Sequence, residues 1–193
     1  MSDLSERVRV QSVEVLSDDW YVLKKTTFDF RRGDGTWQRQ SRETYDRGNG
    51  ATILLYNRRK RTVFLTRQFR YPAFVNGHRN LLIETPAGLL DERSPEEAIR
   101  KETCEETGYV IHNVNKVFEA FMSPGSVTEK LYFFVAEYDS AERQQHGGVV
   151  EDGEDIETIE LELEDAISRI ASGEIRDGKT IMLLQYAKLH LFS

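Results

Sequence analysis

Alternating apolar and polar residues mark the beginning of the chain. Val8 to Leu16 roughly alternates in this way, and two further stretches, Tyr21 to Arg32 and Thr36 to Tyr45, bracket the turn residues Gly33-Asp34-Gly35. A period of two is typical of β-strands, and a short glycine-containing segment between two strands is typical of a hairpin. The pattern predicts an antiparallel β region at the N-terminus.

The next segments are denser in apolar residues. Ala51 to Asn57 and Thr62 to Arg70 have the composition of strands that are buried on both faces. A long loop containing Pro72 and Gly77 is expected to follow. The stretch LLIE at 81–84 then predicts a short strand that leads into a glycine turn.

A well-marked helix comes next. Ser94 is a favourable N-cap, Pro95 suits the first turn, and Glu97, three positions after Ser94, completes a capping-box pattern. Gly108 supplies the stop. The helix is expected to run between these signals.

The remainder of the chain predicts strands followed by helices. A polar segment from Ser140 to Asp155 is too poor in apolar residues to pack, and we expect it to be mobile. The expected strands are Lys116 to Met122, Lys130 to Glu137 and Glu157 to Leu163, and the expected helices are Glu164 to Ala171 and Thr180 to Leu191.

Composition restricts the class of protein. With 193 residues, 39% hydrophobic and 31% charged, the chain fits one globular domain, or one domain with an added subdomain. Its longest apolar run, LYFFVA at 131–136, is too short to span a bilayer, and Met1 to Val10 lacks the apolar core of a signal peptide. The expected location is the cytoplasm, with no membrane partner.

Charge and cysteine content narrow the chemistry. A net charge of -7 argues against a nucleic-acid partner but leaves room for a small anionic ligand held by local arginines and a metal. The single cysteine, Cys104, permits no internal disulfide. We expect Cys104 to be a small buried hydrophobe and not a nucleophile.

Three carboxylates are crowded within the predicted helix. Glu105 and Glu106 lie three and four positions after Glu102, so each repels Glu102 by about a few tenths of a kcal/mol on one helix face. A divalent cation between them would remove that repulsion, since Mg²⁺ is commonly held by a few carboxylates plus substrate phosphates. A solvated acidic face with Lys and Arg partners is the alternative.

The stretch GLLDERSPEEAIRKETCEETGY at 88–109 resembles the Nudix box, a long and specific pattern of a glycine, a capped helix and three glutamates. This chain departs from the pattern in having Lys101 in place of the usual arginine. The interval between Gly88 and the helix is also one residue shorter than usual, and the early glutamate of the pattern is replaced by Ser94 or Arg93, depending on the gap. The resemblance implies that Glu102 and Glu106 ligate metal directly, that Glu105 is a ligand or a water-mediated partner, and that the Ala87 carbonyl completes the shell. It also implies that Glu105 and Glu106 take part in catalysis. Mg²⁺ is the expected ion, with Mn²⁺ as the alternative.

Further segments resemble the sugar-nucleotide and ADP-ribose pyrophosphatase branch of that family, and within it the enzymes that act on GDP-mannose. They cover nearly the whole chain, and GEIRDGKT at 173–180 favours the mannose enzymes. By this resemblance the substrate contacts are Trp20, Arg42, Glu43, Arg70, Gly88, Leu89, Glu129 and Lys179.

Several of these residues have a simpler interpretation. Arg67 and Arg70 lie near the end of a predicted strand, where either could form a surface salt bridge as readily as a phosphate contact. Trp20 could stack on a purine or merely pack. Glu154, in the polar loop, matches a catalytic and metal-binding carboxylate, but an extra residue near Gly153 makes Glu151 the nearest substitute.

The sequence therefore predicts an α/β Nudix fold, a mixed sheet between helices, in residues 47–193, and an added, dimer-forming β region in residues 1–46. In related enzymes that region exchanges between subunits, which implies a homodimer with sites built from both chains. The expected reaction is Mg²⁺-dependent hydrolysis of GDP-mannose to GMP and mannose 1-phosphate. The alternatives are an ADP-ribose pyrophosphatase giving AMP and ribose 5-phosphate, and a non-catalytic nucleotide-sugar sensor.

Overall fold

The computed structural model describes residues 3–139, 143 and 155–192. The chain divides into two compact units. The first holds the chain up to Asn49 together with Phe121–Lys130, and the second holds Gly50–Ala120 and the chain from Leu131 onward.

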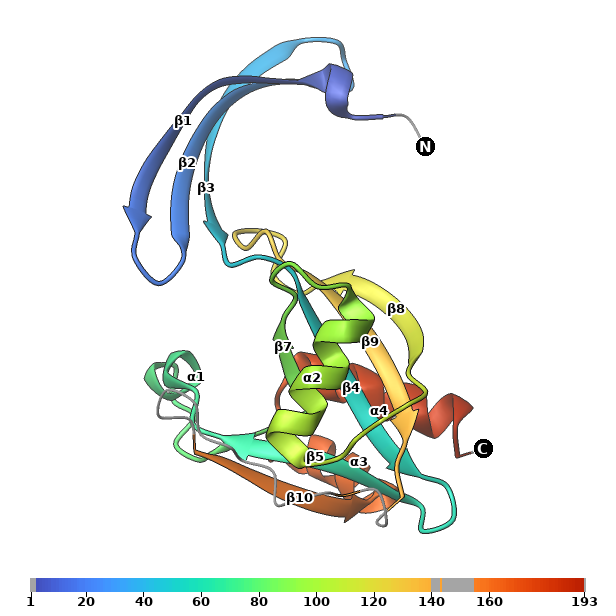
Figure 1. Cartoon of the computed structure of the whole chain (residues 1–193). Coiled ribbons are helices and arrows are strands. Elements are labelled where there is room, and N and C mark those ends of the chain that lie inside the picture. The colour runs from blue at the N-terminus through green and yellow to red at the C-terminus, as the bar shows by residue number, and fades with distance from the viewer. Residues whose placement is uncertain (1–2, 140–142, 144–154, 193) are drawn as a thin grey trace. The chain divides into compact units, whose positions relative to one another are not determined.

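The first unit contains a three-stranded antiparallel sheet (Figure 1). After a short 3-10 turn, η1 (Ser5–Arg7), the strands β1 (Val8–Asp18), β2 (Val22–Arg31) and β3 (Trp37–Asp46) pair in chain order. The predicted N-terminal antiparallel region is confirmed.

Irregular pairing keeps the valines of β1 on one face of this sheet. Val8 and Val10 pair with Phe30 and Phe28, the register then shifts by one residue, and Val13 and Val15 pair with Thr26 and Lys24. All four partners are even-numbered residues of β2, so they lie on one face. Without this one-residue shift between Val10 and Ser12, Val13 and Val15 would lie on the opposite face of the sheet.

The second unit is built on a seven-stranded mixed sheet. Its order is β10-β5-β4-β9-β8, with β6 paired to β5 and β7 paired to β4; β4 and β9 are parallel, whereas β5 pairs antiparallel with β4, β6 and β10. The strands are β4 (Gly50–Asn57), β5 (Thr62–Gln68), β6 (Leu82–Glu84), β7 (Ala87–Leu89), β8 (Asn115–Phe121), β9 (Lys130–Glu137) and β10 (Ile156–Glu162). The predicted strands are confirmed to within one or two residues at most ends. Gly88, expected in a turn, lies in β7.

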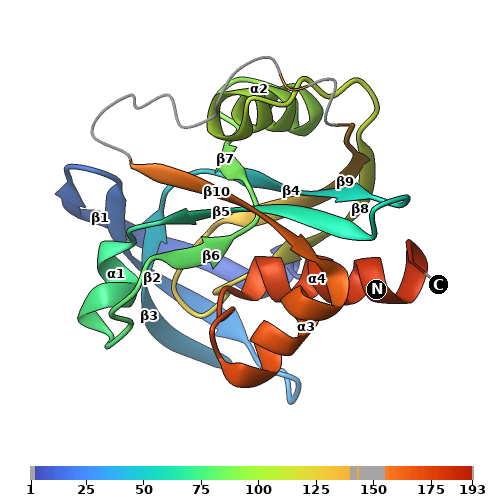
Figure 2. The same ribbon diagram turned by 90° about the horizontal axis from the view of Figure 1, so that it is seen from below.

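Helices cover both faces of this sheet. Figure 2 shows α2 (Pro95–Thr107) on one side, and α3 (Leu163–Ser172) and α4 (Gly178–His190) on the other. The predicted α/β fold with a mixed sheet between helices is confirmed. The loop expected after β5 contains a short helix, α1 (Tyr71–Val75), because Pro72 in its first turn favours helical φ. Among the described residues no helix is long and apolar enough to pass through a membrane.

The core lies on both sides of β4, which is buried along its whole length. On the side of α2, Ile53 and Leu55 pack with Phe64, Ile99 and Tyr109 in one apolar cluster. Complete burial of such side chains stabilises the fold by roughly 1.5–3 kcal/mol each. This burial explains the dense apolar content of the strand.

The orientation of α2 corrects one expectation. Cys104 is exposed, not buried. The buried face of α2 includes Ile99, Thr103 and Thr107, and each successive residue of a helix turns by about 100°, so Cys104 falls beside that face. The two buried threonines donate their hydroxyls to carbonyls one turn back, at 2.6 Å and 2.5 Å, and so remain satisfied.

Candidate active site

Helix α2 is fixed at both ends. The Ser94 side chain accepts a hydrogen bond from the Glu97 backbone N–H at 3.3 Å, and the Glu97 carboxylate accepts one from the Ser94 N–H at 3.0 Å. Gly108 ends the helix in the left-handed conformation, with φ of 76°. The predicted capping box and stop are confirmed, and they set the position of the three glutamates relative to β7.

The helix gives the three glutamates different environments. Glu106 is 8% exposed and Glu102 is half-buried, whereas Glu105 is exposed. Glu105 accepts a hydrogen bond from Lys101 at 2.6 Å, which raises the pKa of that lysine above its usual range. In the described ranges 3–139, 143 and 155–192, no three acidic, histidine or cysteine side chains form a ready metal cluster. The structure brings Glu102 and Glu106 to the sheet and leaves Glu105 at the surface.

Gly88 is in close contact with Glu102. A methyl group built on Gly88 would lie less than 3.0 Å from Cγ, Cδ and Oε1 of Glu102. Strand β7 holds Gly88 opposite Ala51, and Ala87 opposite Thr52, on the buried strand β4. Glycine at 88 therefore lets the Glu102 carboxyl lie directly against the β7 backbone.

The residues around β7 suit a hard divalent cation. A buried carboxylate such as that of Glu106 is costly unless a cation or hydrogen bonds compensate for its charge. Glu102, Glu106 and the Ala87 carbonyl would together supply only oxygen donors, the type that Mg²⁺ and Mn²⁺ prefer. This donor set fits such an ion, and Glu105 could join it if its pair with Lys101 opened.

A second cluster of charges centres on Glu84, which is 3% exposed. Its Oε2 accepts a hydrogen bond from Nε of Arg70 at 2.7 Å, and its Oε1 accepts one from Nζ of Lys179 at 2.5 Å. Burial alone would lower the pKa of Lys179, but the charges of Glu84 and Asp177 outweigh burial and raise it. Lys179 is therefore a cation throughout the neutral range.

Buried hydroxyl groups attach this charge cluster to the sheet. Thr180 accepts a hydrogen bond from the Thr85 backbone N–H at 2.7 Å and donates to Asp177, the N-cap residue of α4, at 2.6 Å. Thr85 in turn contacts Thr52 of β4 at 2.8 Å. The start of α4, and with it Lys179, is thus held against the segment between β6 and β7.

Sequence reasoning did not find Glu84. Its only local signal is a carboxylate at the end of the apolar stretch LLIE, directly before Thr85-Pro86. Arg70 lies two residues beyond β5, at the start of α1, and its pair with Glu84 leaves the side chain 38% exposed. Arg67 forms an ion pair with Glu157 at 2.5 Å, as the salt-bridge interpretation expected.

Four of the expected substrate contacts belong to the first unit. Trp20 is 80% exposed and makes an edge-to-face contact with the neighbouring ring of Tyr21. On β3, Arg42 donates to the Ser41 carbonyl, and Glu43 points to the opposite face from Arg42. Glu129 forms an ion pair with Arg47 at 3.6 Å. Glu154 and its substitute Glu151 lie outside the described residues.

Known proteins match both parts of the sequence. A family model described as the N-terminal domain of the GDP-mannose pyrophosphatase NudK matches residues 7–45. The NUDIX domain model matches residues 46–184.

Curated relatives resemble the chain over nearly its full length. A GDP-mannose pyrophosphatase from Pectobacterium atrosepticum is 57% identical over 185 residues, which cover 95% of both chains. Proteins of the same name from Klebsiella pneumoniae and Yersinia pestis are each 54% identical. The match to the Klebsiella protein covers 95% of this chain and 92% of that relative. The match to the Yersinia protein covers 96% of this chain and 94% of that relative.

Proposed function

The chain belongs to the Nudix hydrolase family, and from this premise we propose that it hydrolyses GDP-mannose to GMP and mannose 1-phosphate. One observation carries the choice of substrate. The 57% identity to a GDP-mannose pyrophosphatase extends over 95% of the chain, including the N-terminal region that has its own family model.

Nudix hydrolases generally require a divalent metal, and we infer that Mg²⁺ serves here, with Mn²⁺ as a substitute. Such an ion neutralises pyrophosphate charge and lowers the pKa of a bound water. Glu102, Glu106 and the Ala87 carbonyl would hold it, and Glu105 and Glu154 would complete or assist its coordination. The contact between Gly88 and Glu102 supports this assignment, because it places a carboxylate directly beside the backbone of β7.

Arg70 and Lys179 are assigned to the phosphates. Both are cations anchored on the same buried carboxylate, Glu84, so their positions are set before any substrate arrives. Guanidinium and ammonium groups bind phosphate through charge-assisted hydrogen bonds. The backbone of Gly88 and Leu89 in β7 would line the same phosphate-binding site.

Trp20, Arg42, Glu43 and Glu129 are assigned to the rest of the nucleotide sugar. The exposure of Trp20 leaves its ring available to stack on a base. We further propose that the enzyme is a homodimer in which the N-terminal β region of each chain contributes to the site of the other. Action on nucleic acid or at a membrane, and a location outside the cytoplasm, are not expected.

A panel of nucleotide sugars tests the proposed reaction. We expect kcat/KM with Mg²⁺ to be highest for GDP-mannose, ahead of ADP-ribose, and mass spectrometry to identify GMP and mannose 1-phosphate. A higher kcat/KM for ADP-ribose would make ADP-ribose, and not GDP-mannose, the preferred substrate. No product from any member, with Mg²⁺ or Mn²⁺, would indicate a sensor that binds without turnover.

A further inference from the structure

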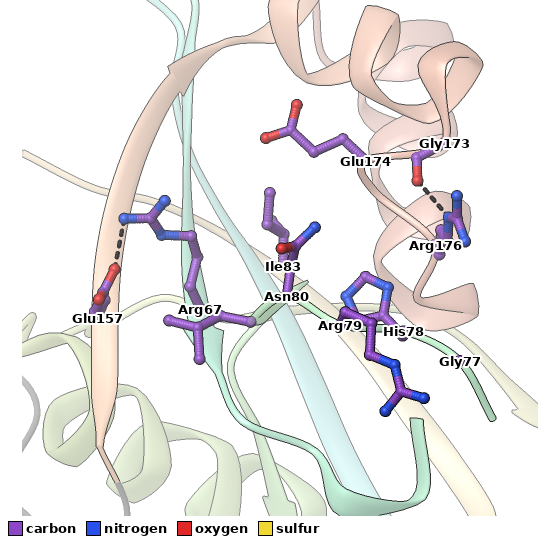
Figure 3. A pocket seen from close by; sticks show the side chains of 11 residues that line it. Arg67, Gly77, His78, Arg79, Asn80, Ile83, Glu157, Gly173, Glu174 and Arg176 are labelled. Carbon is purple, nitrogen blue, oxygen red and sulfur yellow. Dashed lines mark hydrogen bonds and ion pairs between the residues drawn. The ribbon is translucent and has the colours of Figure 1, made fainter. Parts of the chain in front are cut away.

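A cavity of about 550 Å³ opens in the second unit (Figure 3), and its lining residues include neither Glu102 nor any residue of β7. Its wall comes from the neighbouring strands β10, β5 and β6, the segment between α1 and β6, and the segment between α3 and α4. The polar side chains that matter to the argument are Arg67, His78, Asn80, Glu157, Glu174 and Arg176. We refer to this cavity as the Arg176 pocket.

The Arg176 pocket faces the other side of the sheet from Glu84. Arg67 pairs with Ile83 across β5 and β6, and both residues line the pocket. The neighbouring pair is Thr66 and Glu84. Successive residues of a strand point to opposite faces, so Glu84, which anchors Arg70 and Lys179, lies on the face opposite the pocket-lining pair.

Arg176 is held in place by its own backbone segment. Its Nε donates to the carbonyl of Gly173, the residue that ends α3 with φ of 79°. A methyl group on Gly173 would lie 3.3 Å from one terminal nitrogen of the guanidinium, so glycine makes room for this close contact. Ile175, 1% exposed, anchors the same segment in the core. The guanidinium is thus preorganised in the wall of the pocket.

Two buried nitrogen atoms in the wall also lack partners. Within the described part of the chain, Nε2 of His78 and Nε of Arg67 are shielded from solvent and make no hydrogen bond. A buried polar atom left in this state costs roughly 1–3 kcal/mol. Because Nε2 of His78 is shielded, a ligand in the cavity would reach it only after the ring turns, and Figure 3 shows that ring at the edge of the cavity.

The acidic residues of the wall are already neutralised. Glu157 is paired with Arg67 at 2.5 Å, and Glu174 with Arg169 at 2.8 Å. Arg176 has no ion pair among the residues that the structure describes. The lining therefore keeps an excess of positive charge, at Arg176 and at Arg79, whose guanidinium lies 4.4 Å from the centre of the Phe74 ring.

We propose that the Arg176 pocket is a second ligand site, distinct from the catalytic site, that binds a small phosphorylated sugar. Arg176 and His78 would hold the phosphate group, because a guanidinium offers parallel donors that match phosphate oxygens. The amide of Asn80 and the carboxylate of Glu174 would hydrogen-bond the sugar hydroxyls. A cavity of this volume lies within the range of about 300–1,000 Å³ that is usual for small-molecule sites.

Mannose 1-phosphate is the appropriate probe, a choice that rests on the proposed function, since the reaction releases it. Binding is measured on the full chain by calorimetry in EDTA, so that no metal supports the catalytic site. The substitution Arg70→Gln serves as a background that removes a phosphate contact from that site. In this background we expect binding with a stoichiometry of one per chain.

Three variants in that background locate the ligand. Arg176→Gln is expected to weaken binding at least tenfold, and His78→Gln severalfold. Arg59→Gln, an exposed arginine on the turn between β4 and β5, is expected to leave binding unchanged. Circular dichroism of each variant confirms that the chain is folded.

Two further probes identify the class of ligand. Mannose is expected not to bind, and inorganic phosphate is expected to bind more weakly than mannose 1-phosphate. Equal affinities for mannose 1-phosphate and inorganic phosphate would show that the site recognises only the phosphate group, and would contradict recognition of the sugar.

The proposal is overturned if mannose 1-phosphate does not bind, or if Arg176→Gln binds it as well as the parent does. Turnover of GDP-mannose with Mg²⁺ is measured separately on the unsubstituted chain, so failure of the second site and failure of the proposed reaction are distinguished.

Discussion

Glu102, Glu105 and Glu106 show how residues of one type acquire different properties within five positions. The Glu102 side chain lies directly against Gly88, Glu106 is buried, and Glu105 is exposed and paired with Lys101. The difference arises because a helix turns about 100° per residue while the sheet covers only one side of α2. A carboxylate in the sequence therefore has a role only through the face on which it falls.

Gly88→Ala tests the contact between β7 and α2. The added methyl group would displace the Glu102 side chain, and we expect kcat with Mg²⁺ to fall by about tenfold or more, as for the loss of support to a metal ligand. The thermal midpoint should change little, because a glutamate side chain can swing into solvent. Gly33→Ala, with no atom within 4 Å of its new methyl group, is the matched control and should keep full activity. Normal turnover by Gly88→Ala would exclude Glu102 from metal binding.

Glu106→Gln tests the buried carboxylate itself. The substitution keeps the size of the side chain but removes its charge, and we expect turnover to fall by about 100-fold or more while the circular dichroism spectrum stays unchanged. Glu96→Gln, on an exposed position of the same helix, should retain activity. A Glu106→Gln enzyme that turns over at a near-normal rate would refute the ligand assignment.

At the scale of elements, one carboxylate joins two strands of the second unit, β10 and β5, to Tyr138, the residue that follows β9. Glu160 of β10 accepts hydrogen bonds from the Tyr138 hydroxyl at 2.8 Å and from Thr62 of β5 at 2.9 Å. Burial by itself would raise the pKa of Glu160, but these hydrogen bonds, together with the Lys60 ammonium at 3.3 Å, outweigh burial and hold it below its ordinary value. Burial also raises the pKa of the Tyr138 hydroxyl far above its usual range, so that group remains a donor.

The lowered pKa of Glu160 predicts a pH dependence of stability. A carboxyl whose pKa is lower in the folded chain stabilises it above the ordinary value of 4.5, and this contribution disappears as the pH falls through the folded pKa. We expect Glu160→Gln to lower the urea midpoint at pH 7, and to differ less from the parent at pH 3. Glu162→Gln, exposed on the same strand, should differ little from the parent at both values. An equal deficit of Glu160→Gln at both pH values would contradict the assigned role.

At the scale of the whole molecule, the sheet of the first unit leaves apolar side chains uncovered. Val8, Val10, Val13 and Val15 are between 38% and 60% exposed and lie on one face of β1. An apolar row on one face of an exposed sheet is typical of an interaction surface. This row supports the proposal that a second copy of the chain covers it.

The assembly prediction is tested by light scattering after gel filtration. The chain is expected to have twice its mass of 22.4 kDa, and the double substitution of Val10 and Val13 by Asp is expected to give the single mass, because charged groups oppose burial of that face. Ser12→Asp lies on the other face of the same strand and should remain dimeric. A parent chain that elutes as a monomer at all concentrations would remove the proposal of shared sites.

Sequence reasoning located the elements well and the side-chain contacts poorly. The strands and the capping box of α2 were predictable because periodicity and caps depend on residues a few positions apart. The five residues of α1 are too few to show a period, and the burial of Cys104 was assigned to the wrong side of α2. The roles of the predicted site residues stay predictions.

The sequence by itself determined the α/β class, the family and the position of α2 shortly after Gly88, because each is encoded in a continuous stretch of the chain. Only the tertiary structure decided that Glu84 joins Arg70 and Lys179, which lie 14 and 95 positions away from it. It also decided that Arg176 and His78 border one cavity. Such contacts form between segments that are far apart in the sequence. A local pattern of residues does not show which distant segments pack together.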